Sequence, residues 1–296
     1  MSIFKGSGVA LITPFKLVNE KSEVDYDMLK KLCDMHVNNG TDAIIICGTT
    51  GESATLSHEE HEKCIKKCIE YVNGKIPVIA GTGSNDTNRA IELSKKAETM
   101  GADALLCVTP YYNKTNQEGL INYYTDIAKN VDIPIIMYNV PSRTGVNIEP
   151  NTAYEIALKN DNVVAIKEAS GNISQITKLA SLKALDIYSG NDDQIVPILS
   201  VGGIGVISVL ANIFPRETHD MVMTYLDGDV KGAMELQLAS VDLCNALFSD
   251  VNPIPVKKAM EIMYGDSGIV RKPLIKLSEE KTKVLKKEID NFNKTI

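Results

Sequence analysis

The chain has 296 residues, of which 44% are hydrophobic and 23% are charged, as in ordinary globular proteins, and this length allows one large or two modest domains. The formal net charge of −7 argues against nucleic acid or an anionic membrane as the main partner, because like charges repel. No apolar run approaches the roughly 20 residues that span a bilayer, and residues 1–6 lack the apolar core of a secretory signal, so we expect a cytoplasmic protein.

Short apolar runs rich in β-branched residues alternate with helical patterns along most of the chain. The predicted strands cover residues 9–13, 43–47, 78–81, 104–109, 135–139, 163–167, 187–189 and 205–209. The predicted helices cover residues 25–39, a segment that opens with the capping-box pattern Ser57-His58-Glu59-Glu60, and residues 86–100, 117–130, 150–160, 173–184, 192–201 and 214–226. The strand starts recur roughly every 18 to 35 residues, which is the spacing of βα units rather than of hairpins.

Eight alternating units in residues 1–226 predict an α/β protein with a (β/α)8 barrel of the TIM type. A doubly wound open sheet is the alternative, but it would place a phosphate-binding turn after the first strand, where this chain has Thr13-Pro14-Phe15. After residue 226 the alternation stops, and helices are predicted at 230–248, 255–264 and 278–291. We therefore predict a catalytic barrel domain over residues 1–226 and a small C-terminal helical domain over residues 227–296.

A lysine, Lys167, ends the apolar strand at 163–167. Burying an ammonium group is costly, and the usual escape is a lowered pKa and a neutral amine. A neutral amine attacks carbonyl carbon, so one interpretation is a Schiff-base lysine. The other is a lysine whose stem packs on apolar surface while its head reaches water. The position at the C-terminal end of a barrel strand, where such barrels carry their active sites, favours the first interpretation.

The other predicted strand ends carry phenol, hydroxyl and guanidinium groups. Tyr138, on the neighbouring strand, is placed to exchange protons with an imine, and Thr49 and Tyr112 have hydroxyls that would pass the proton onward. Thr50 lies beside glycines that let backbone amides approach a carboxylate, and Arg143 offers a planar fork for a second carboxylate. Each residue alone is ordinary in a strand or loop, but their joint position predicts a site for carbonyl condensation.

Three motifs follow these strand ends: Gly48-Thr49-Thr50-Gly51-Glu52-Ser53-Ala54-Thr55-Leu56, Tyr138-Asn139-Val140-Pro141-Ser142-Arg143-Thr144-Gly145 and Ile166-Lys167-Glu168-Ala169. They resemble the signatures of the dihydrodipicolinate synthase family, pyruvate-dependent class I aldolases within the N-acetylneuraminate lyase superfamily. Asn252-Pro253-Ile254-Pro255-Val256-Lys257 is also similar, so the resemblance covers essentially the whole chain.

The resemblance implies the first committed step of lysine and diaminopimelate biosynthesis, in which a lyase condenses pyruvate with L-aspartate 4-semialdehyde. Lys167 would form the imine, Tyr138 would exchange protons with it, and Thr49 and Tyr112 would complete a relay, with Tyr112 coming from a neighbouring subunit. Arg143 would hold the carboxylate of the semialdehyde. The other substrate contacts would be Thr50, Ile207 and Gly190. Because the imine forms with the substrate itself, no cofactor is expected, and members of the family are typically homotetramers built from tight dimers.

The resemblance also implies a feedback site for L-lysine. The matching positions are Ser53, Ala54, Leu56, His58, His61, Asn85, Arg89 and Tyr111. Lysine-sensitive members carry a glutamate at the position of Arg89, and a cation there should repel the ammonium groups of lysine. Inhibition by L-lysine is therefore an open hypothesis for this chain.

Two other functions stay open at this point. One is a related aldolase for another aldehyde, such as a sialic-acid or keto-sugar-acid lyase; Arg143 argues against it because it suits a short substrate carboxylate. The other is a catalytically silent barrel that senses pyruvate or lysine. The joint presence of Lys167, Tyr138, Thr49 and Tyr112 argues against a sensor.

The cysteines and histidines do not predict a metal site. Six cysteines are scattered without a CxxC pair, and we interpret them as reduced, mostly buried thiols: Cys33, Cys47, Cys64, Cys68, Cys107 and Cys244. His58, His61, Cys64 and Cys68 lie about one turn apart on one predicted helix, and one straight helix cannot surround a tetrahedral ion.

Overall fold

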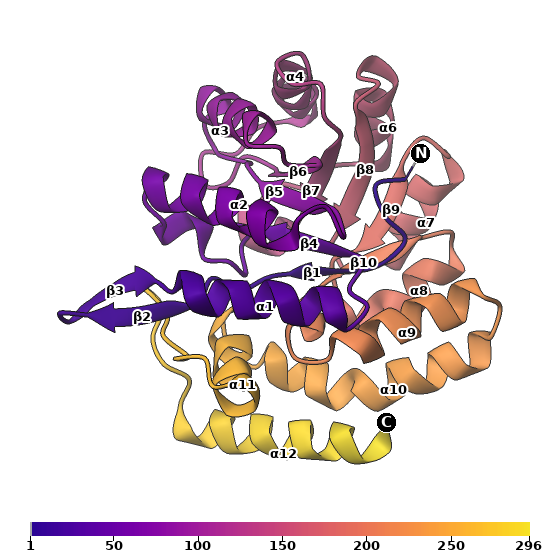
Figure 1. The fold of residues 1–296 in the computed structure, drawn as a ribbon. Helices are drawn as coiled ribbons and strands as arrows, with labels where there is room; N and C mark the ends of the chain where they lie inside the picture. The colour runs from indigo at the N-terminus through magenta and orange to yellow at the C-terminus, as the bar shows by residue number, and fades with distance from the viewer. Residues whose placement is uncertain (1) are drawn as a thin grey trace.

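The structure is a computed structural model that describes residues 2–296. Within these residues, eight parallel strands close into a barrel in the order β1-β10-β9-β8-β7-β6-β5-β4, with helices packed around it (Figure 1). The strands are β1 (Gly6–Ala10), β4 (Ala43–Ile46), β5 (Val78–Gly81), β6 (Ala104–Val108), β7 (Ile135–Asn139), β8 (Val163–Glu168), β9 (Asp186–Ser189) and β10 (Gly205–Ser208). The predicted α/β class and TIM-barrel architecture are confirmed.

The barrel strands are buried on both faces, because helices cover the outside and side chains fill the inside. All four residues of β4, Ala43–Ile46, have an exposed fraction of 0%. Such strands have no polar face and appear in the sequence as uninterrupted apolar runs. This is why the predicted bounds of β4 to β10 agree with the structure to within one residue.

The first strand begins earlier than predicted, since β1 covers Gly6–Ala10 and the prediction placed it at residues 9–13. A Cβ on Gly8 would lie 2.8 Å from side-chain atoms of both Phe4 and Ile45. The Phe4 ring therefore fills this part of the interior in place of a side chain from the strand. The glycines hide the strand from a search for apolar runs.

The helices between the strands lie where the sequence predicted them, with ends that differ by at most three residues. They are α1 (Tyr26–Asn38), α2 (His58–Val72), α3 (Thr87–Thr99), α4 (Gln117–Ala128), α6 (Pro150–Lys159), α7 (Ile173–Ser181), α8 (Ile195–Ser200), preceded by the short η2 (Asp192–Gln194), and α9 (Pro215–Leu226). The predicted capping box at the start of α2 is present, because Ser57 Oγ accepts from Glu60 N while the Glu60 carboxylate accepts from Ser57 N.

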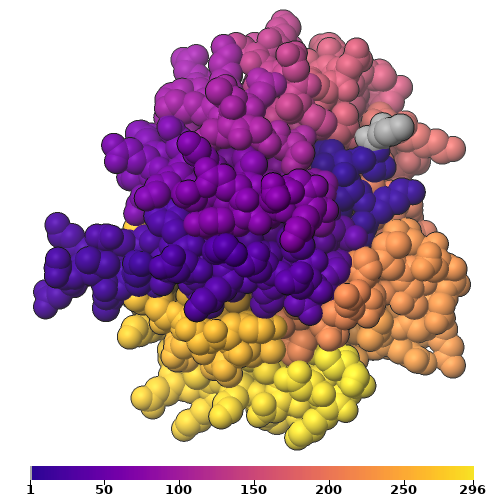
Figure 2. All heavy atoms as spheres, in the orientation of Figure 1, coloured from indigo at the N-terminus to yellow at the C-terminus, as the bar shows by residue number. Residues whose placement is uncertain are grey.

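A β-hairpin was missed by the sequence prediction. It joins β2 (Phe15–Val18) to β3 (Lys21–Val24) through Asn19 and Glu20, whose φ values are 48° and 64°. A two-residue turn with both residues at positive φ matches the twist of an antiparallel pair, but Asn-Glu is a weaker sequence signal for it than Asn-Gly. The hairpin protrudes from the side of the molecule in indigo (Figure 2).

Three one-turn helical segments were also missed, and each follows a barrel strand on the side where the site lies. They are η1 (Ser53–Thr55), α5 (Pro141–Thr144) and η3 (Leu210–Asn212). Segments this short carry no helical periodicity in the sequence.

The three C-terminal helices are α10 (Val230–Leu247), α11 (Ile254–Tyr264) and α12 (Glu279–Thr295), as predicted except that α12 runs farther. α10 lies beside α9, and α12 packs against α10 and α11 (Figure 1). The rings of Phe214 and Phe292 meet edge to face with centroids 4.7 Å apart. Leu285 and Ile289 belong to the same hydrophobic core as the barrel. The division into domains at residue 226 stays a prediction. Across residues 2–296, none of the helices combines the length and apolar character needed to cross a membrane.

Candidate active site

Lys167 lies near the C-terminal end of β8 and is 5% exposed. In the pairing of β7 with β8, Tyr138 is its direct partner. Both side chains project from neighbouring strands at the same level, and Lys167 Nζ lies 4.5 Å from the centre of the Tyr138 ring. The register of two strands therefore places the amine against the phenol.

Burial lowers the pKa of Lys167 to about 8, the Asp192 carboxylate opposes this shift, and the Arg143 guanidinium adds to it. With that pKa, about one tenth of the amine is neutral at pH 7, compared with less than about one part in a thousand for an ordinary lysine. A neutral amine in an apolar pocket is the nucleophile that imine formation requires. The environment of Lys167 thus fits the first interpretation of this residue rather than that of a solvated lysine.

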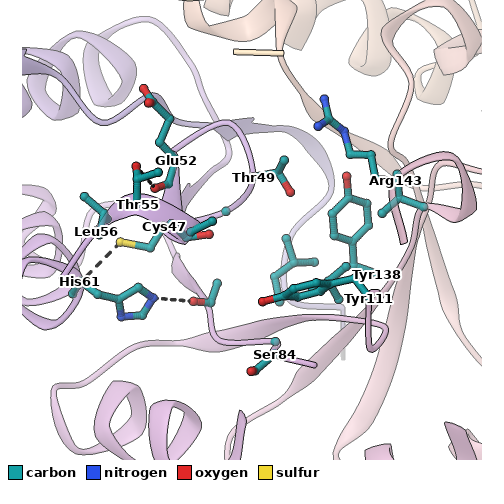
Figure 3. A pocket seen from close by; sticks show the side chains of 18 of the residues that line it. Cys47, Thr49, Glu52, Thr55, Leu56, His61, Ser84, Tyr111, Tyr138 and Arg143 are labelled. Carbon is teal, nitrogen blue, oxygen red and sulfur yellow. Dashed lines mark hydrogen bonds between the residues drawn. The ribbon is translucent and has the colours of Figure 1, made fainter. Parts of the chain in front are cut away.

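Burial raises the pKa of Tyr138, and the Arg143 guanidinium and a hydrogen bond with the Thr49 hydroxyl oppose this shift. The phenol is therefore protonated at neutral pH and has a proton to donate. Figure 3 shows the Tyr138 hydroxyl pointing toward Arg143, with Thr49 across the cavity that these side chains line. These three side chains come from the ends of β7 and β4 and from α5, and they line one cavity.

The loop after β4 holds Thr50, which is 3% exposed. Thr50 Oγ1 accepts a hydrogen bond of 2.9 Å from Asn252 Nδ2. Because this bond occupies a lone pair, the hydroxyl hydrogen of Thr50 remains free to donate to a substrate carboxylate. Arg143 is exposed, and its Nη2 donates to the Asn252 carbonyl oxygen over 3.2 Å. Asn252 thus touches both residues that were predicted to hold carboxylates.

The same loop is tied to the C-terminal helices by a buried ion pair. Lys257 Nζ lies 2.6 Å from Glu52 Oε1, and Arg271 N donates to Glu52 Oε2 over 2.9 Å. The side chains of Lys257 and Glu52 are 0% and 1% exposed. Sequence reasoning gave no role to Asn252, Lys257 or Glu52, although they lie in the motifs that carried the family resemblance.

Of the remaining predicted site residues, Gly190 lies next to Lys167, Ile207 lies in the barrel interior, and Tyr112 lies away from Lys167. A Cβ on Gly190 would lie 3.1 Å from Lys167 Cε, so the glycine leaves room beside the amine. Ile207 is fully buried on β10 in the barrel interior. Tyr112, with φ at 72°, is 91% exposed and is not brought to Lys167 within the chain.

A cavity of about 520 Å³ connects the catalytic loops with the predicted effector positions. Its inner part is lined by Thr49, Tyr138 and Arg143. Its outer part is lined by all the predicted effector residues except Asn85, namely Ser53, Ala54, Leu56, His58, His61, Arg89 and Tyr111. Lys167 does not itself line the cavity. Its Nζ lies against the ring of Tyr138, and Tyr138 does line the cavity.

Arg89 is the charged cationic side chain at the predicted effector positions. Arg89 Nη1 forms an ion pair with Glu92 at 2.8 Å, and its Nη2 contacts His58 Nδ1. His61 Nε2 donates to the Gly81 carbonyl over 2.9 Å, and burial lowers the pKa of His61. Glu52 is the acidic side chain that the described part of the chain contributes to this lining, and it is paired with Lys257.

The cysteines are buried and free, as predicted. Cys33 Sγ and Cys68 Sγ lie 3.8 Å apart in the core between α1 and α2. Over residues 2–296, no group of three or more His, Cys, Asp or Glu side chains is arranged to hold a metal ion.

The chain is similar to known proteins over nearly its whole length. The model described as the dihydrodipicolinate synthetase family matches residues 3–292. The 4-hydroxy-tetrahydrodipicolinate synthase of Lachnoclostridium phytofermentans is 57% identical and that of Clostridium tetani is 55% identical, each over 98% of both chains. A crystal structure of dihydrodipicolinate synthase from Aquifex aeolicus is 43% identical, with a TM-score of 0.95 and 98% of each chain covered.

Proposed function

The chain belongs to the dihydrodipicolinate synthetase family, and we propose that it condenses pyruvate with L-aspartate 4-semialdehyde through an imine on Lys167. This is the reaction of the 4-hydroxy-tetrahydrodipicolinate synthases that it resembles. The observation that carries the proposal is a buried amine with a pKa of about 8 against a buried phenol. The reaction makes the precursor of diaminopimelate and lysine, and we place it in the cytoplasm.

In the first half of the reaction, the neutral amine of Lys167 attacks the ketone carbon of pyruvate. Tyr138 passes the two protons of the amine nitrogen, one after the other, to the ketone oxygen, which leaves as water as the C=N bond forms. The hydroxyl of Thr49 supports the phenol in this exchange. The Thr50 hydroxyl donates to the pyruvate carboxylate, with Gly190 and Ile207 shaping the space around the ketone.

In the second half, a proton leaves the methyl group of the pyruvate imine, and the resulting enamine forms a carbon–carbon bond to the aldehyde carbon of the semialdehyde. The aldehyde oxygen takes up a proton and becomes the hydroxyl of the product. The amine of the second substrate then attacks the imine carbon, and Lys167 leaves as the free amine. No cofactor enters this sequence of steps, because the lysine itself supplies the covalent electrophile.

Arg143 is the residue proposed to orient the second substrate. Its side chain lines the cavity together with Tyr138 and Thr49, and a guanidinium matches a carboxylate in a bidentate fork. Three relatives, at 57%, 55% and 57% identity, are named 4-hydroxy-tetrahydrodipicolinate synthase. These names support the synthase reaction over that of a sialic-acid or keto-sugar-acid lyase, and over a sensor without catalytic activity.

We propose that the protein works as a homotetramer, a dimer of dimers, in which Tyr112 of one subunit completes the proton relay of another. The 91% exposure of a large aromatic ring at a strained loop position, φ 72°, supports this assignment. Replacing Tyr112 by Phe should then slow imine formation without changing the association state, measured by analytical ultracentrifugation.

We propose that L-lysine binds the outer part of the cavity only weakly. Arg89 places a cation beside the region where the ammonium groups of lysine would lie, and its pairing with Glu92 offsets only part of that charge.

The function is tested by trapping the imine. The protein is incubated with pyruvate and borohydride, digested, and mapped by mass spectrometry, and the expected adduct lies on Lys167. An adduct on another residue, or none, overturns the proposed mechanism.

Replacing Arg143 by Ala should leave trapping nearly intact while lowering turnover of the semialdehyde. An equal loss of both would show that Arg143 does not act on the second substrate.

A further inference from the structure

A buried polar network lies behind the catalytic strands, on the outer side of β7 and β8. It consists of Asn139, Asn147, Glu168 and Gln175, and we call it the Asn139–Glu168 network. Asn139 and Glu168 are 0% and 1% exposed. Nothing in the proposed reaction uses these side chains directly.

The position of the network follows from strand geometry. Tyr138 pairs with Lys167 across β7 and β8, and the next pair along the same two strands is Asn139 with Glu168. Successive side chains of a strand point to opposite faces. One pair therefore faces the reaction space inside the barrel, and the next pair lies immediately behind it.

Glu168 is held by donors alone. Its two oxygens lie 3.1 and 3.0 Å from Asn139 Nδ2, Oε1 accepts from Ser170 N over 2.8 Å, and Oε2 accepts from Gln175 Nε2 over 3.5 Å. Burial raises the pKa of Glu168, and the hydrogen bonds from Ser170 and Asn139 oppose this. A buried carboxylate held only by neutral donors costs stability that an apolar pair would not, which points to a role other than stability.

Asn139 connects this carboxylate to the segment that carries Arg143. Asn139 Oδ1 accepts from Ile148 N over 2.9 Å, and Asn139 Nδ2 donates to Asn147 Oδ1 over 2.9 Å. Residues 139–148, which include α5, are thereby closed into a loop whose two ends meet at the Asn139 side chain.

Gln175 of α7 fastens the same loop from the other side. Its Nε2 donates to Asn147 Oδ1 over 3.1 Å, and its Oε1 accepts from Asn147 Nδ2 over 2.8 Å. The loop that bears Arg143 is thus anchored, through side chains, to the strand that bears Lys167.

We propose that Glu168 and Asn139 are positioning residues for Arg143, holding its guanidinium at a fixed place relative to the imine on Lys167. This inference rests on the function proposed above. The β7–β8 register is also secured by the backbone ladder, whereas the segment that carries α5 is joined to β8 and α7 through these side chains. Loss of the network should therefore disturb the second substrate more than the imine.

The network acts through geometry rather than through charge on the amine. The charged groups that shift the pKa of Lys167 are Asp192 after β9 and Arg143 on α5, and Glu168 is not among them. When the charge of Glu168 is removed, the inflection of imine formation should move in the same direction as in Arg143→Ala and no farther, because Arg143 also lowers the pKa of Lys167. A larger shift, or one in the opposite direction, would contradict a purely positional role.

The test begins with Glu168→Gln, which turns a donor toward Asn139 Nδ2. We expect kcat/KM for the semialdehyde to fall by about 10- to 100-fold, the scale of a misplacement near 1 Å, while borohydride trapping of pyruvate stays close to that of the unchanged protein. Adding Asn139→Asp restores one donor facing one acceptor between residues 139 and 168, but it also removes the donor to Asn147 Oδ1. This double variant should therefore recover part of the lost activity. A double variant no more active than either single variant would overturn the proposal.

Non-additivity with Arg143→Ala tests the route of the effect. If Glu168 acts through the guanidinium, Glu168→Gln should lower kcat/KM no further once Arg143 has been replaced. A full second loss in that background, or parallel losses of trapping and condensation in Glu168→Gln alone, would show that the network supports the fold in general and would overturn the proposal.

Two further variants separate positioning from stability. Glu155→Gln removes a charge from the exposed Glu155–Lys159 pair of α6, at 2.7 Å, and should leave activity unchanged. Gln175→Ala keeps the Asn139–Glu168 contact but removes one anchor, so it should show the same selective loss to a smaller degree. It serves as the test if Glu168→Gln fails to fold. Equal activity of Gln175→Ala and the unchanged protein would then count against the proposal. Failure of the unchanged protein to trap pyruvate would instead refute the proposed function.

Discussion

The pKa of the Lys167 amine is set by burial and by two charged neighbours that act in opposite directions. Burial and Arg143 lower its pKa, while Asp192 raises it. Asp192 is 2% exposed, its Oδ2 accepts from Val209 N and Leu210 N at 3.0 and 2.9 Å, and its Oδ1 has no partner among the described residues. The lysine is therefore neutral often enough to react, and Asp192 keeps its pKa from falling farther.

The pH dependence of imine formation should follow this balance. Below about pH 8 the rate should rise about tenfold per pH unit, because only the neutral amine attacks, and it should flatten above that pH. Asp192→Asn removes the group that raises the pKa and should move the inflection to lower pH, whereas Arg143→Ala should move it to higher pH. The measurement is a rapid-quench trapping rate against pH, with the exposed neighbour Asp193→Asn as control. Shifts in the same direction for both variants would refute this balance of charges.

Arg89 is the residue at which the resemblance predicts a departure from the lysine-sensitive pattern. Replacing it by Glu would exchange a cation that faces the outer cavity for an anion that attracts the ammonium groups of lysine. We expect inhibition by L-lysine to be weak in the unchanged protein and stronger by about tenfold or more in Arg89→Glu, the effect of one favourable charge contact. A steady-state titration with L-lysine measures this. Strong inhibition that Arg89→Glu leaves unaltered would place the effector elsewhere.

At the scale of elements, the C-terminal helices support the loop that follows β4. Lys257 of α11 reaches Glu52 beside the Phe15 ring, with Lys257 Nζ 3.9 Å from the ring centre. Burial lowers the pKa of Lys257, and the Glu52 carboxylate opposes this shift. The loop and the helix are far apart in sequence, and this pair holds Thr49 and Thr50 in the site.

Breaking the pair from one side should be costly. Lys257→Met leaves a buried carboxylate that keeps only the backbone donor of Arg271, and we expect a loss of about 3–5 kcal/mol in the free energy of unfolding, measured by urea denaturation. The matched control Lys258→Met removes a partly exposed pair with Glu261 and should cost less than about 1 kcal/mol. Adding Glu52→Gln to Lys257→Met should recover part of the stability. A double variant that is no more stable than Lys257→Met would mean that the charge imbalance is not the cause.

At the scale of the whole molecule, the two ends of the barrel have different tasks. The C-terminal ends of the strands carry the proposed active site, and near the N-terminal ends lie histidines that we expect to affect stability. His36 is fully buried, its Nδ1 lies 2.9 Å from Thr41 Oγ1, and burial lowers its pKa to about 3. His219 Nδ1 lies 2.8 Å from Asp42 Oδ2, and that contact raises the pKa of His219.

These shifts predict opposite pH effects on folding. The unfolded chain protonates His36 near pH 6.5 and the folded chain only near pH 3, so stability should fall below about pH 6.5 by up to about 1.4 kcal/mol per pH unit. The contribution of His219 is fully present below about pH 6.5 and is lost as pH rises through its raised folded pKa. Urea unfolding at several pH values measures both effects, and His36→Gln should reduce the acid sensitivity. Unchanged acid sensitivity in that variant would assign it to other groups.

The sequence by itself determined the barrel and predicted the place of its chemistry. Strands buried on both faces are mostly apolar, so β4 to β10 could be recognised without a structure, and Lys167 could be assigned to the sixth of the predicted strands. Local signals of this kind depend only on neighbouring residues. The predicted bounds of β1 were wrong because Gly8 has no side chain, and the Phe4 ring, which lies outside the strand, occupies that space.

Only the tertiary structure decided which groups support the catalytic residues. Asn252 reaches Thr50 across 202 positions and Lys257 reaches Glu52 across 205, and Glu168 meets Asn139 because two strands share a register. Such contacts leave no periodicity, since each depends on where two distant segments meet after folding. The pKa of about 8 at Lys167 has the same origin: the burial and the two opposing charges that set it come from separate elements, which only the closed barrel brings together.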